Sequence, residues 1–515
     1  MSDTPCVEMT KLPSPGDVLQ KYWGYEDFRP GQLRVIENVI RGSDALLVMP
    51  TGGGKSLCFQ VPSLCMRGVT LVVSPLVALM KDQVDTLVSL GIPATFINSS
   101  ISDGERRSRV EGMRNGAYKL VYIAPERLDS ASFFDALRST DVSLIAIDEA
   151  HCISQWGHNF RPAYRRIDRV FRACTKDGER PPVMALTATA TPEVQDDIVK
   201  ILDMEDPFRL ITGFDRPNLN ISVQKQAKGT QEFFIDTQAR KILGSADGKT
   251  SEIPVTVWYA GTRTKTEAVA ARLNELAVAA GHREVAVAYH AGMKDSDREK
   301  VQEGFMSGEF PWVVATNAFG MGIDKADIRY VVHICFPGSI EAYYQEIGRA
   351  GRDGKDSECI LAFIPGAGFG TDEGMQWYFI DIACPPERVF QNCYSMLKIV
   401  ASQYQKNPRQ GFRMTYDEFC KETQSRYGKG WAIKGQISTV LTKLKSLGAF
   451  DAPRRGWMRI PEKKISQRSL EDLGIDFAAL DAKRVRDELK LEAMLAYADS
   501  DDPRIEIRRY FGEDV

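Results

Sequence analysis

Short apolar runs recur along the chain up to about residue 365, and each is followed by a longer stretch that mixes apolar and polar residues. Apolar runs of about 4–8 residues are typical of strands buried on both faces. Their alternation with helical stretches is typical of parallel sheets covered by helices. The first series of predicted strands is 45–49, 70–74, 94–97, 119–123, 143–147 and 183–186. The second series is 254–259, 285–288, 312–315, 329–334 and 358–363.

The two series are separated near residues 213–218, Gly-Phe-Asp-Arg-Pro-Asn. We therefore predict two α/β domains in tandem, over residues 1–213 and 214–365, each built on a doubly wound parallel sheet. Ligands of such sheets bind beyond the carboxyl ends of the strands. A nucleotide bound to the first domain would then lie in the cleft between the two domains.

Beyond residue 365 the pattern becomes mainly helical, after a glycine-rich linker predicted over 366–384. Residues 385–465 hold three predicted helices and two short extended runs around a basic turn, which is the arrangement of a winged helix. A structural helical domain with a solvated basic face is the alternative. A helical pair is predicted within 466–515. The predicted helices are 385–403, 415–426, 432–447, 481–499 and 503–511, and the basic turn carries Arg454 and Arg455.

The bulk composition of the 515 residues is that of a globular protein of several domains, with 43% hydrophobic and 26% charged residues. A net charge of −3 means that any nucleic-acid binding depends on local basic patches. No apolar stretch approaches the ~20 residues needed to span a bilayer, and we expect no membrane partner. The ten cysteines include no Cys-x-x-Cys pair, which favours a reducing compartment. This would be the cytoplasm of a bacterial or virus-infected cell, at the nucleoid where there is one, or a eukaryotic nucleus.

A phosphate-binding loop is predicted at residues 49–56, Met-Pro-Thr-Gly-Gly-Gly-Lys-Ser, where an apolar run meets a helical stretch. Three successive glycines let backbone N–H groups face a phosphate, and the helix N-terminus adds a partial positive charge. Lys55 would reach the β- and γ-phosphates, and the Ser56 hydroxyl would bind Mg²⁺. The strict pattern begins with glycine where this chain has Met49, so the loop alone could be an ordinary one. The predicted nucleotide-binding residues of this loop are Thr51, Gly52, Gly53, Gly54, Lys55 and Ser56.

A pair of carboxylates follows the predicted strand 143–147, in the string Asp-Glu-Ala-His. Asp148 would hold the metal ion, directly or through water, and Glu149 would orient or deprotonate the attacking water. The phosphate-binding loop and the Asp-Glu-Ala-His string each follow a predicted apolar strand, and the loop comes first in the chain. Together they predict nucleotide hydrolysis with Mg²⁺.

Further motifs occur in a fixed order along both predicted domains. They lie at 28–32, 74–83, 124–128, 154–162, 186–190, 289–293, 315–325 and 344–354. In this set the chain resembles the helicase core of the RecQ family of superfamily 2 helicases, over roughly residues 15–365. The resemblance implies two RecA-like domains, ATP and Mg²⁺ as cofactors, and DNA as partner.

The resemblance also implies roles for single residues. Tyr25 would stack on adenine, with Arg29 and Gln32 contacting the base. Arg349 and Arg352, in the second domain, would reach the γ-phosphate held by the first, with Gln345 of the same Gln-x-x-Gly-Arg-x-Gly-Arg string beside them.

The segment after the acidic pair resembles the aromatic-rich loop with which the family senses single-stranded DNA. The residues implied to couple DNA to ATP hydrolysis are Gln155, Trp156, His158, Phe160 and Arg161. Trp156 and Phe160 could instead be core aromatics. Asn159 stands where the family usually has aspartate, so the strength of DNA stimulation stays open.

The C-terminal region departs from the family pattern. The family's Tyr-Phe-Gly-Glu string is present at 510–513, but Asp502 occupies the position of the first zinc-binding cysteine. The chain ends at Val515 before the other three, so we expect no zinc site. We expect the helical pair to be secured by packing against the helicase core. The predicted winged helix precedes this pair, so it could be an insertion.

From the resemblance we expect an ATP-dependent DNA helicase that moves 3′ to 5′ as a monomer, in recombination, repair or replication. A DNA-stimulated ATPase that translocates along DNA, or remodels or anneals it, without net unwinding is the alternative. An RNA helicase would share the fold and the ATP chemistry. A non-enzymatic scaffold is disfavoured because Lys55, Glu149 and Arg352 are all present.

Overall fold

The computed structural model describes residues 12–157, 161–244, 253–317, 319, 325–406, 414–428, 430–450, 457–458, 468–513 and 515. The chain forms two compact units, of which the first combines Met1–Phe363 with Tyr497–Val515 and the second is Ile364–Ala496. The domain boundaries predicted from the sequence stay predictions.

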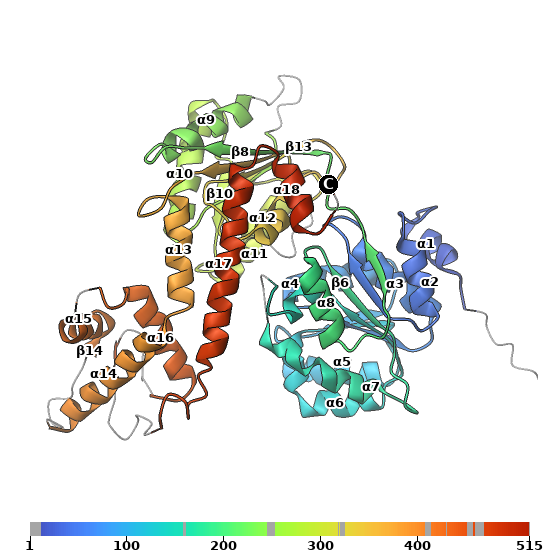
Figure 1. Cartoon of the computed structure of the whole chain (residues 1–515). Helices are drawn as coiled ribbons and strands as arrows, with labels where there is room; N and C mark the ends of the chain where they lie inside the picture. Colours follow the sequence, from blue (N-terminus) through green and yellow to red (C-terminus); the bar gives the residue numbers. More distant parts are fainter. Residues whose placement is uncertain are drawn as a thin grey trace, which may run out of the picture. The chain divides into compact units, whose positions relative to one another are not determined.

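The N-terminal half of the first unit, coloured from blue to green in Figure 1, is built on a parallel sheet. This sheet has seven strands in the order β3-β4-β2-β5-β6-β1-β7. Its strands are β1 Ala45–Val48, β2 Val69–Val73, β3 Ala94–Ile97, β4 Leu120–Ile123, β5 Val142–Ile147, β6 Val183–Thr187 and β7 Phe208–Ile211. Its helices are α1 Pro15–Trp23, α2 Gln32–Ile40, α3 Lys55–Cys65, α4 Val77–Ser89, α5 Asp103–Arg114, α6 Ala131–Arg138, α7 Ile167–Cys174 and α8 Pro192–Ile201. Short 3₁₀ helices are η1 Pro125–Asp129, η2 Ala150–Ile153 and η3 Pro162–Arg166.

A second parallel sheet has six strands in the order β10-β11-β9-β12-β13-β8. Its strands are β8 Leu219–Lys225, β9 Thr256–Tyr259, β10 Ala286–Tyr289, β11 Trp312–Ala315, β12 Tyr330–His333 and β13 Ser357–Phe363. Its helices are α9 Gln231–Gly244, α10 Arg263–Ala279, α11 Asp295–Ser307 and α12 Ile340–Ile347. The predicted fold class of two tandem parallel-sheet α/β domains is confirmed.

Two strands of these parallel sheets, β7 and β8, were not predicted from sequence patterns, and each lies at an edge of its sheet. Neither is a continuous apolar run, because Arg209 interrupts β7 and polar side chains alternate with apolar ones along β8, Leu-Asn-Ile-Ser-Val-Gln-Lys. An edge strand has a neighbour on one side only, so its burial and its apolar signal are weaker.

The two faces of the second sheet carry different apolar layers. Trp258 and Trp312 are fully buried against side chains of α9 and α10. On the alternate positions, Tyr259 stacks on His333, which meets the ring of Tyr343 in α12. This alternation follows from the two-residue period of a strand.

The C-terminal helix α18, Pro503–Tyr510, packs on the second sheet's domain. Phe511 stacks on Phe214 with ring centroids 4.3 Å apart and planes at 9°. Tyr497, at the end of α17 (Phe477–Asp499), meets the ring of Tyr343 at 5.3 Å. Asp502, at the position of the family's first zinc ligand, instead caps α18 by accepting from two backbone N–H groups at 3.1 Å. The C-terminal segment thus packs against this domain, and its stabilisation by that packing stays a prediction.

Phe511→Ala should lower the free energy of unfolding of this domain by about 3–5 kcal/mol, because it removes a buried, stacked ring. The measurement is urea unfolding followed by circular dichroism, with Phe511→Leu as a volume control that retains most of the apolar contact. An unchanged midpoint for the alanine variant would show that α18 contributes nothing to stability.

The second unit is mainly helical. Its helices are α13 Asp372–Ala383, α14 Glu387–Lys406, α15 Tyr416–Tyr427 and α16 Lys434–Ser446, followed by the first part of α17. Strand β14, Met414–Thr415, pairs antiparallel with β15, Trp457–Met458. The winged-helix arrangement stays a prediction, because most of the predicted hairpin lies outside the described residues. Arg454 and Arg455 lie outside the described residues.

Helix α13 occupies most of the stretch predicted to be a linker. Thr371 caps it by accepting from the Gly374 N–H, and Asp372 and Glu373 add negative charge to its first turn. Within the predicted linker, the glycine-rich residues 366–370, Thr371 and Cys384 stay non-helical. Of the helices that the structure describes, none is long and apolar enough to cross a membrane.

Candidate active site

The phosphate-binding loop connects β1 to α3, and its glycines adopt conformations that other residues rarely reach. Gly52 and Gly54 have φ angles of 78° and 84°. A Cβ atom on Gly53 would lie 2.9 Å from the Pro50 carbonyl oxygen. Helix α3 begins at Lys55, so the loop ends at the positive end of a helix dipole. This geometry suits an anion such as a phosphate.

Gln32 and Arg29, both predicted to contact the base, donate hydrogen bonds to carbonyl oxygens of the phosphate-binding loop. The Gln32 amide donates to the carbonyl oxygens of Gly53 at 3.3 Å and Gly54 at 3.1 Å. Arg29 donates through its guanidinium to the Gly52 carbonyl, and through its backbone N–H to the Gln32 side chain at 2.9 Å. Tyr25 lies nearby in the sequence and is exposed, as a residue that stacks on a ligand must be.

Gly54→Ala should weaken ATP binding by more than tenfold. A Cβ at this position would lie 2.7 Å from the Gln32 amide nitrogen, and the positive φ would add strain of about 1–2 kcal/mol. Gly91→Ala is the matched control, because Gly91 has a φ of 78° but open space around it. Equal ATP affinity of the two variants, measured by fluorescence titration with a labelled nucleotide, would contradict this account of the loop.

Lys55 and the acidic pair lie close together at the mouth of the loop. The Lys55 ammonium donates to the carbonyl oxygens of Met49 at 2.9 Å and Pro50 at 3.2 Å. Burial lowers the pKa of Lys55, and Glu149 and Asp148 oppose this shift. Burial and the neighbouring Glu149 raise the pKa of Asp148 to about 7, against the effect of Lys55. Ser74 donates to Asp148 at 3.4 Å.

His151 connects the acidic pair to the next strand. Its Nδ1 lies 3.3 Å from a Glu149 carboxylate oxygen and 2.9 Å from the Thr187 hydroxyl of β6, and its ring is fully buried. Burial lowers the pKa of His151, but Cys152 and Glu149 raise it, to about 10. Glu149 itself has a φ of 49°, so its orientation depends on these contacts.

The residues predicted from the second domain line the same pocket as the phosphate-binding loop. The pocket has a volume of about 370 Å³. Arg349 is buried and donates to the Tyr259 hydroxyl at 2.9 Å. Burial lowers the pKa of Lys55, and the charge of Arg352 adds a smaller contribution in the same direction. The predicted residues in the lining are Thr51, Gly52, Gly54, Lys55, Ser56, Asp148, Glu149, Gln345, Arg349 and Arg352.

Four lining residues were not predicted to belong to the site: Leu76, Leu79, Gln83 and Ala326. The first three fall in the motif at 74–83, so the motif signalled their region but not their role. The Gln83 side chain accepts a hydrogen bond from the Gln60 amide at 2.8 Å, which holds it in the pocket lining.

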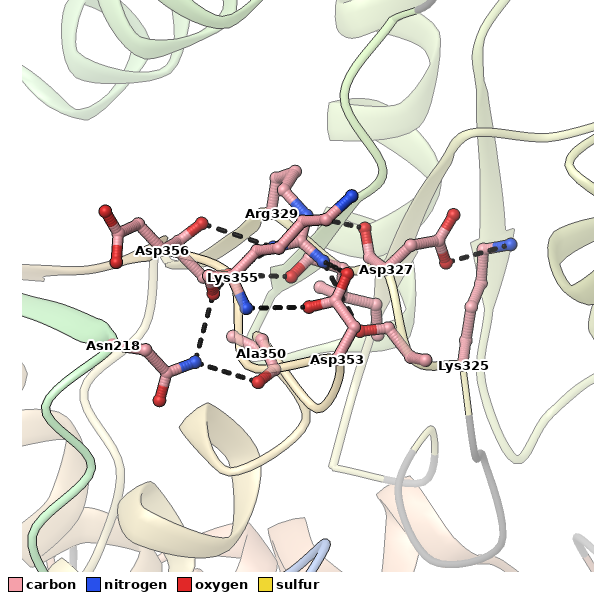
Figure 2. A network of polar contacts seen from close by, with 12 residues as sticks. Asn218, Lys325, Asp327, Arg329, Ala350, Asp353, Lys355 and Asp356 are labelled. Atoms are coloured by element: carbon pink, nitrogen blue, oxygen red, sulfur yellow. Dashed lines mark hydrogen bonds and ion pairs between the residues drawn. The ribbon is translucent and has the colours of Figure 1, made fainter.

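The turn that carries Arg352 is held by a polar network shown in Figure 2. Arg329 donates to the Asp353 carboxylate at 2.6 Å and to the Asp356 carbonyl at 3.2 Å. Asn218 donates to the carbonyl oxygens of Gly351 at 2.8 Å and Lys355 at 3.0 Å. Arg352 is thereby presented from a fixed turn.

The predicted DNA-sensing segment starts directly after η2. Gln155 and Trp156 are exposed, and the Trp156 N–H donates to the Ser154 hydroxyl at 3.0 Å. A core position for Trp156 is therefore excluded. Arg161 lies 3.7 Å from Glu126. His158, Asn159 and Phe160 lie outside the described residues.

Comparison with known proteins places the chain among helicases. A DEAD/DEAH box helicase model matches residues 29–198, and a helicase conserved C-terminal domain model matches residues 249–354. The ATP-dependent DNA helicase RecQ of Bacillus subtilis is 44% identical over 400 residues, 78% of this chain and 64% of that relative. The probable ATP-dependent DNA helicase RecS of the same species is 38% identical over 359 residues, 70% of this chain and 68% of that relative. The chain belongs to the RecQ family of superfamily 2 helicases.

The RecQ-family resemblance predicted from the motifs is thus confirmed. The chain spans about half to two thirds of the length of the RecQ relatives it matches, between 52% and 64%. A crystal structure of the helicase MrfA bound to DNA has the same fold, with a TM-score of 0.59 and 20% identity over 92% of this chain and 61% of that one.

Proposed function

We propose that this RecQ-family protein is an ATP-dependent DNA helicase that moves 3′ to 5′ along one strand and separates duplex DNA. The observation that carries the proposal is the shared pocket, which combines the phosphate-binding loop and acidic pair with two arginines and a glutamine of the second domain. The relatives named as ATP-dependent DNA helicases support DNA as the substrate.

The residues present fit ATP with Mg²⁺. Gly52 to Gly54 and the N-terminus of α3 would bind the phosphates, with Lys55 between the β- and γ-phosphates. Burial, and secondly the charge of Glu149, raise the pKa of Asp148, and a divalent cation would offset both effects. Ser56 and Asp148 would hold this ion, which would neutralise charge on the phosphates.

Hydrolysis would then depend on three groups of this chain. Glu149 would orient the attacking water and accept its proton, held in place by His151. Arg352 would stabilise the charge that develops on the γ-phosphoryl oxygens. Because Arg352 belongs to the second domain, hydrolysis would require that domain to close on the first.

Coupling to DNA is proposed to run through the segment directly after η2. Trp156 offers an exposed ring two residues beyond Ser154, and stacking of a base on an aromatic ring contributes about 1–3 kcal/mol without sequence preference. His151, in η2 just before this segment, contacts Glu149. Each base-pair step costs about 1.4 kcal/mol to open, which ATP turnover would have to supply.

The test of this proposal is ATP hydrolysis with Mg²⁺ in the presence of single-stranded DNA or RNA of the same sequence, with Lys55→Ala as control. DNA should accelerate hydrolysis by the intact protein at least tenfold, and the variant should stay inactive. Equal or stronger stimulation by RNA would instead support an RNA helicase, since dependence on 2′-hydroxyls distinguishes the two. We propose action as a monomer in recombination, repair or replication, at the bacterial nucleoid or in a nucleus.

A further inference from the structure

One arginine outside the predicted site contacts both loops that meet at the nucleotide pocket. Arg216 lies in the segment between β7 and β8 that connects the two sheets. Its guanidinium donates to the Thr51 carbonyl of the phosphate-binding loop at 3.3 Å. It also donates to the carbonyl oxygens of Ala350 and Gly351, directly before Arg352, at 3.1 Å each. One side chain thus joins the loop that holds phosphate to the turn that carries Arg352.

The segment around Arg216 is fixed on both sides by the C-terminal helix. Phe214 stacks on Phe511, and its N–H donates to the Glu513 carboxylate. Asp215 pairs with Arg504 at 3.1 Å, and Arg504 also donates to the Leu219 carbonyl at 2.6 Å. The backbone that carries Arg216 is therefore held in place, so the reach of its side chain is defined.

The hydrogen-bond partners of Arg216 suit a contact that can break when the two domains separate. Among the described residues it forms no ion pair and meets carbonyl and amide oxygens only. The bond to Thr51 is longer than the two bonds to the Arg352 turn, and Asn218 ties that turn to the same segment. Separation of the domains would break the Thr51 bond first and leave Arg216 attached to the turn.

We propose that Arg216 is a positioning residue for the closed arrangement of the two domains. It joins the phosphate-binding loop to the turn before Arg352, so that Arg352 reaches the γ-phosphate. This inference rests on the proposed ATPase function. Arg216 does not line the pocket and acts through Arg352. A displacement of about 1 Å in a reacting group can cost about 10²-fold in rate.

The test compares Arg216→Gln with Arg329→Gln. Arg329 holds the same turn, through Asp353 and Asp356, but its hydrogen-bond partners among the described residues all belong to the second domain (Figure 2). Arg216→Gln should lower kcat for DNA-stimulated ATP hydrolysis about 10- to 100-fold and leave ATP affinity without DNA within about twofold. Arg329→Gln should lower the melting temperature more and kcat less.

A second measurement distinguishes an effect of the substitution on domain closure from a general loss of side-chain packing. Affinity for a fluorescent ADP with aluminium fluoride, Mg²⁺ and single-stranded DNA mimics the closed transition state, and Arg216→Gln should weaken it by about the same factor as kcat. Arg216→Lys should behave like Arg216→Gln, because one ammonium cannot replace the fork that spans both loops. It also serves as the test protein if the glutamine variant does not fold.

Equal losses of kcat in Arg216→Gln and Arg329→Gln, or wild-type affinity of Arg216→Gln for the transition-state mimic, would overturn the inference. An intact protein without DNA-stimulated hydrolysis would contradict the proposed function instead. The inference would then be judged on binding of the mimic alone.

Discussion

Arg352→Ala should lower kcat for ATP hydrolysis by about 10³-fold or more, while ATP affinity in the absence of DNA changes little. An arginine that reaches the γ-phosphoryl group from a second domain contributes about 10³- to 10⁵-fold to kcat in related phosphoryl transfers. Arg352 and Lys55 line the same pocket, and the charge of Arg352 adds to the burial that lowers the pKa of Lys55. ATP would still be bound by the first domain alone.

Two comparisons make this result specific. Arg349 is buried and bonded to the Tyr259 hydroxyl, so Arg349→Ala should also lower the melting temperature, whereas Arg352→Ala should not. Arg272→Ala removes an exposed ion pair with Asp236 in the same domain and should leave kcat unchanged. Steady-state kinetics and nucleotide titrations give both quantities. Retention of a tenth or more of kcat by Arg352→Ala would show that Arg352 does not reach the reacting phosphate.

Glu149→Gln should lower kcat by about 10²- to 10⁴-fold, the usual contribution of a general base. Glutamine keeps the size of the side chain and its contact with His151 but cannot accept the proton of water. ATP affinity should be kept or rise slightly, because a negative charge near the phosphates is removed. The variant should therefore hold ATP and DNA together without turnover.

The control for Glu149→Gln is Glu111→Gln, which makes the same chemical change in an exposed pair with Arg114. Single-turnover measurements with excess protein separate the chemical step from product release. If the chemical step in Glu149→Gln runs within about tenfold of the wild-type rate, another group acts as the base, and the role proposed for Glu149 is wrong.

The sequence predicted the fold most reliably where strands are buried on both faces. Strand β11 has the predicted bounds, because its four consecutive apolar residues, Trp-Val-Val-Ala, leave few alternatives. The edge strands β7 and β8 were not predicted, since their polar positions remove that signal. Helix α13 was not predicted because the glycines before it dominated the pattern, and its cap at Thr371 was overlooked.

For the candidate site, too, some residues were predicted from the sequence and others were not. Lys55 and Asp148 belong to short motifs that follow predicted strands, so they could be recognised from the sequence. In the structure both residues line the same pocket. Arg216 gave no such signal, because its importance depends on carbonyl oxygens that are distant in the sequence. The anchoring of α18 by Phe511 also depends on tertiary contacts, which spacing along one chain does not reveal.

The most direct test of the central claim is separation of matched duplexes that carry either a 3′ or a 5′ single-stranded tail, with ATP and Mg²⁺ and with Lys55→Ala as control. The account predicts that the intact protein opens only the 3′-tailed duplex and that the variant opens neither. If neither duplex opens while single-stranded DNA still accelerates hydrolysis, the protein is a translocase or remodelling enzyme, and the claim that it is a helicase is contradicted.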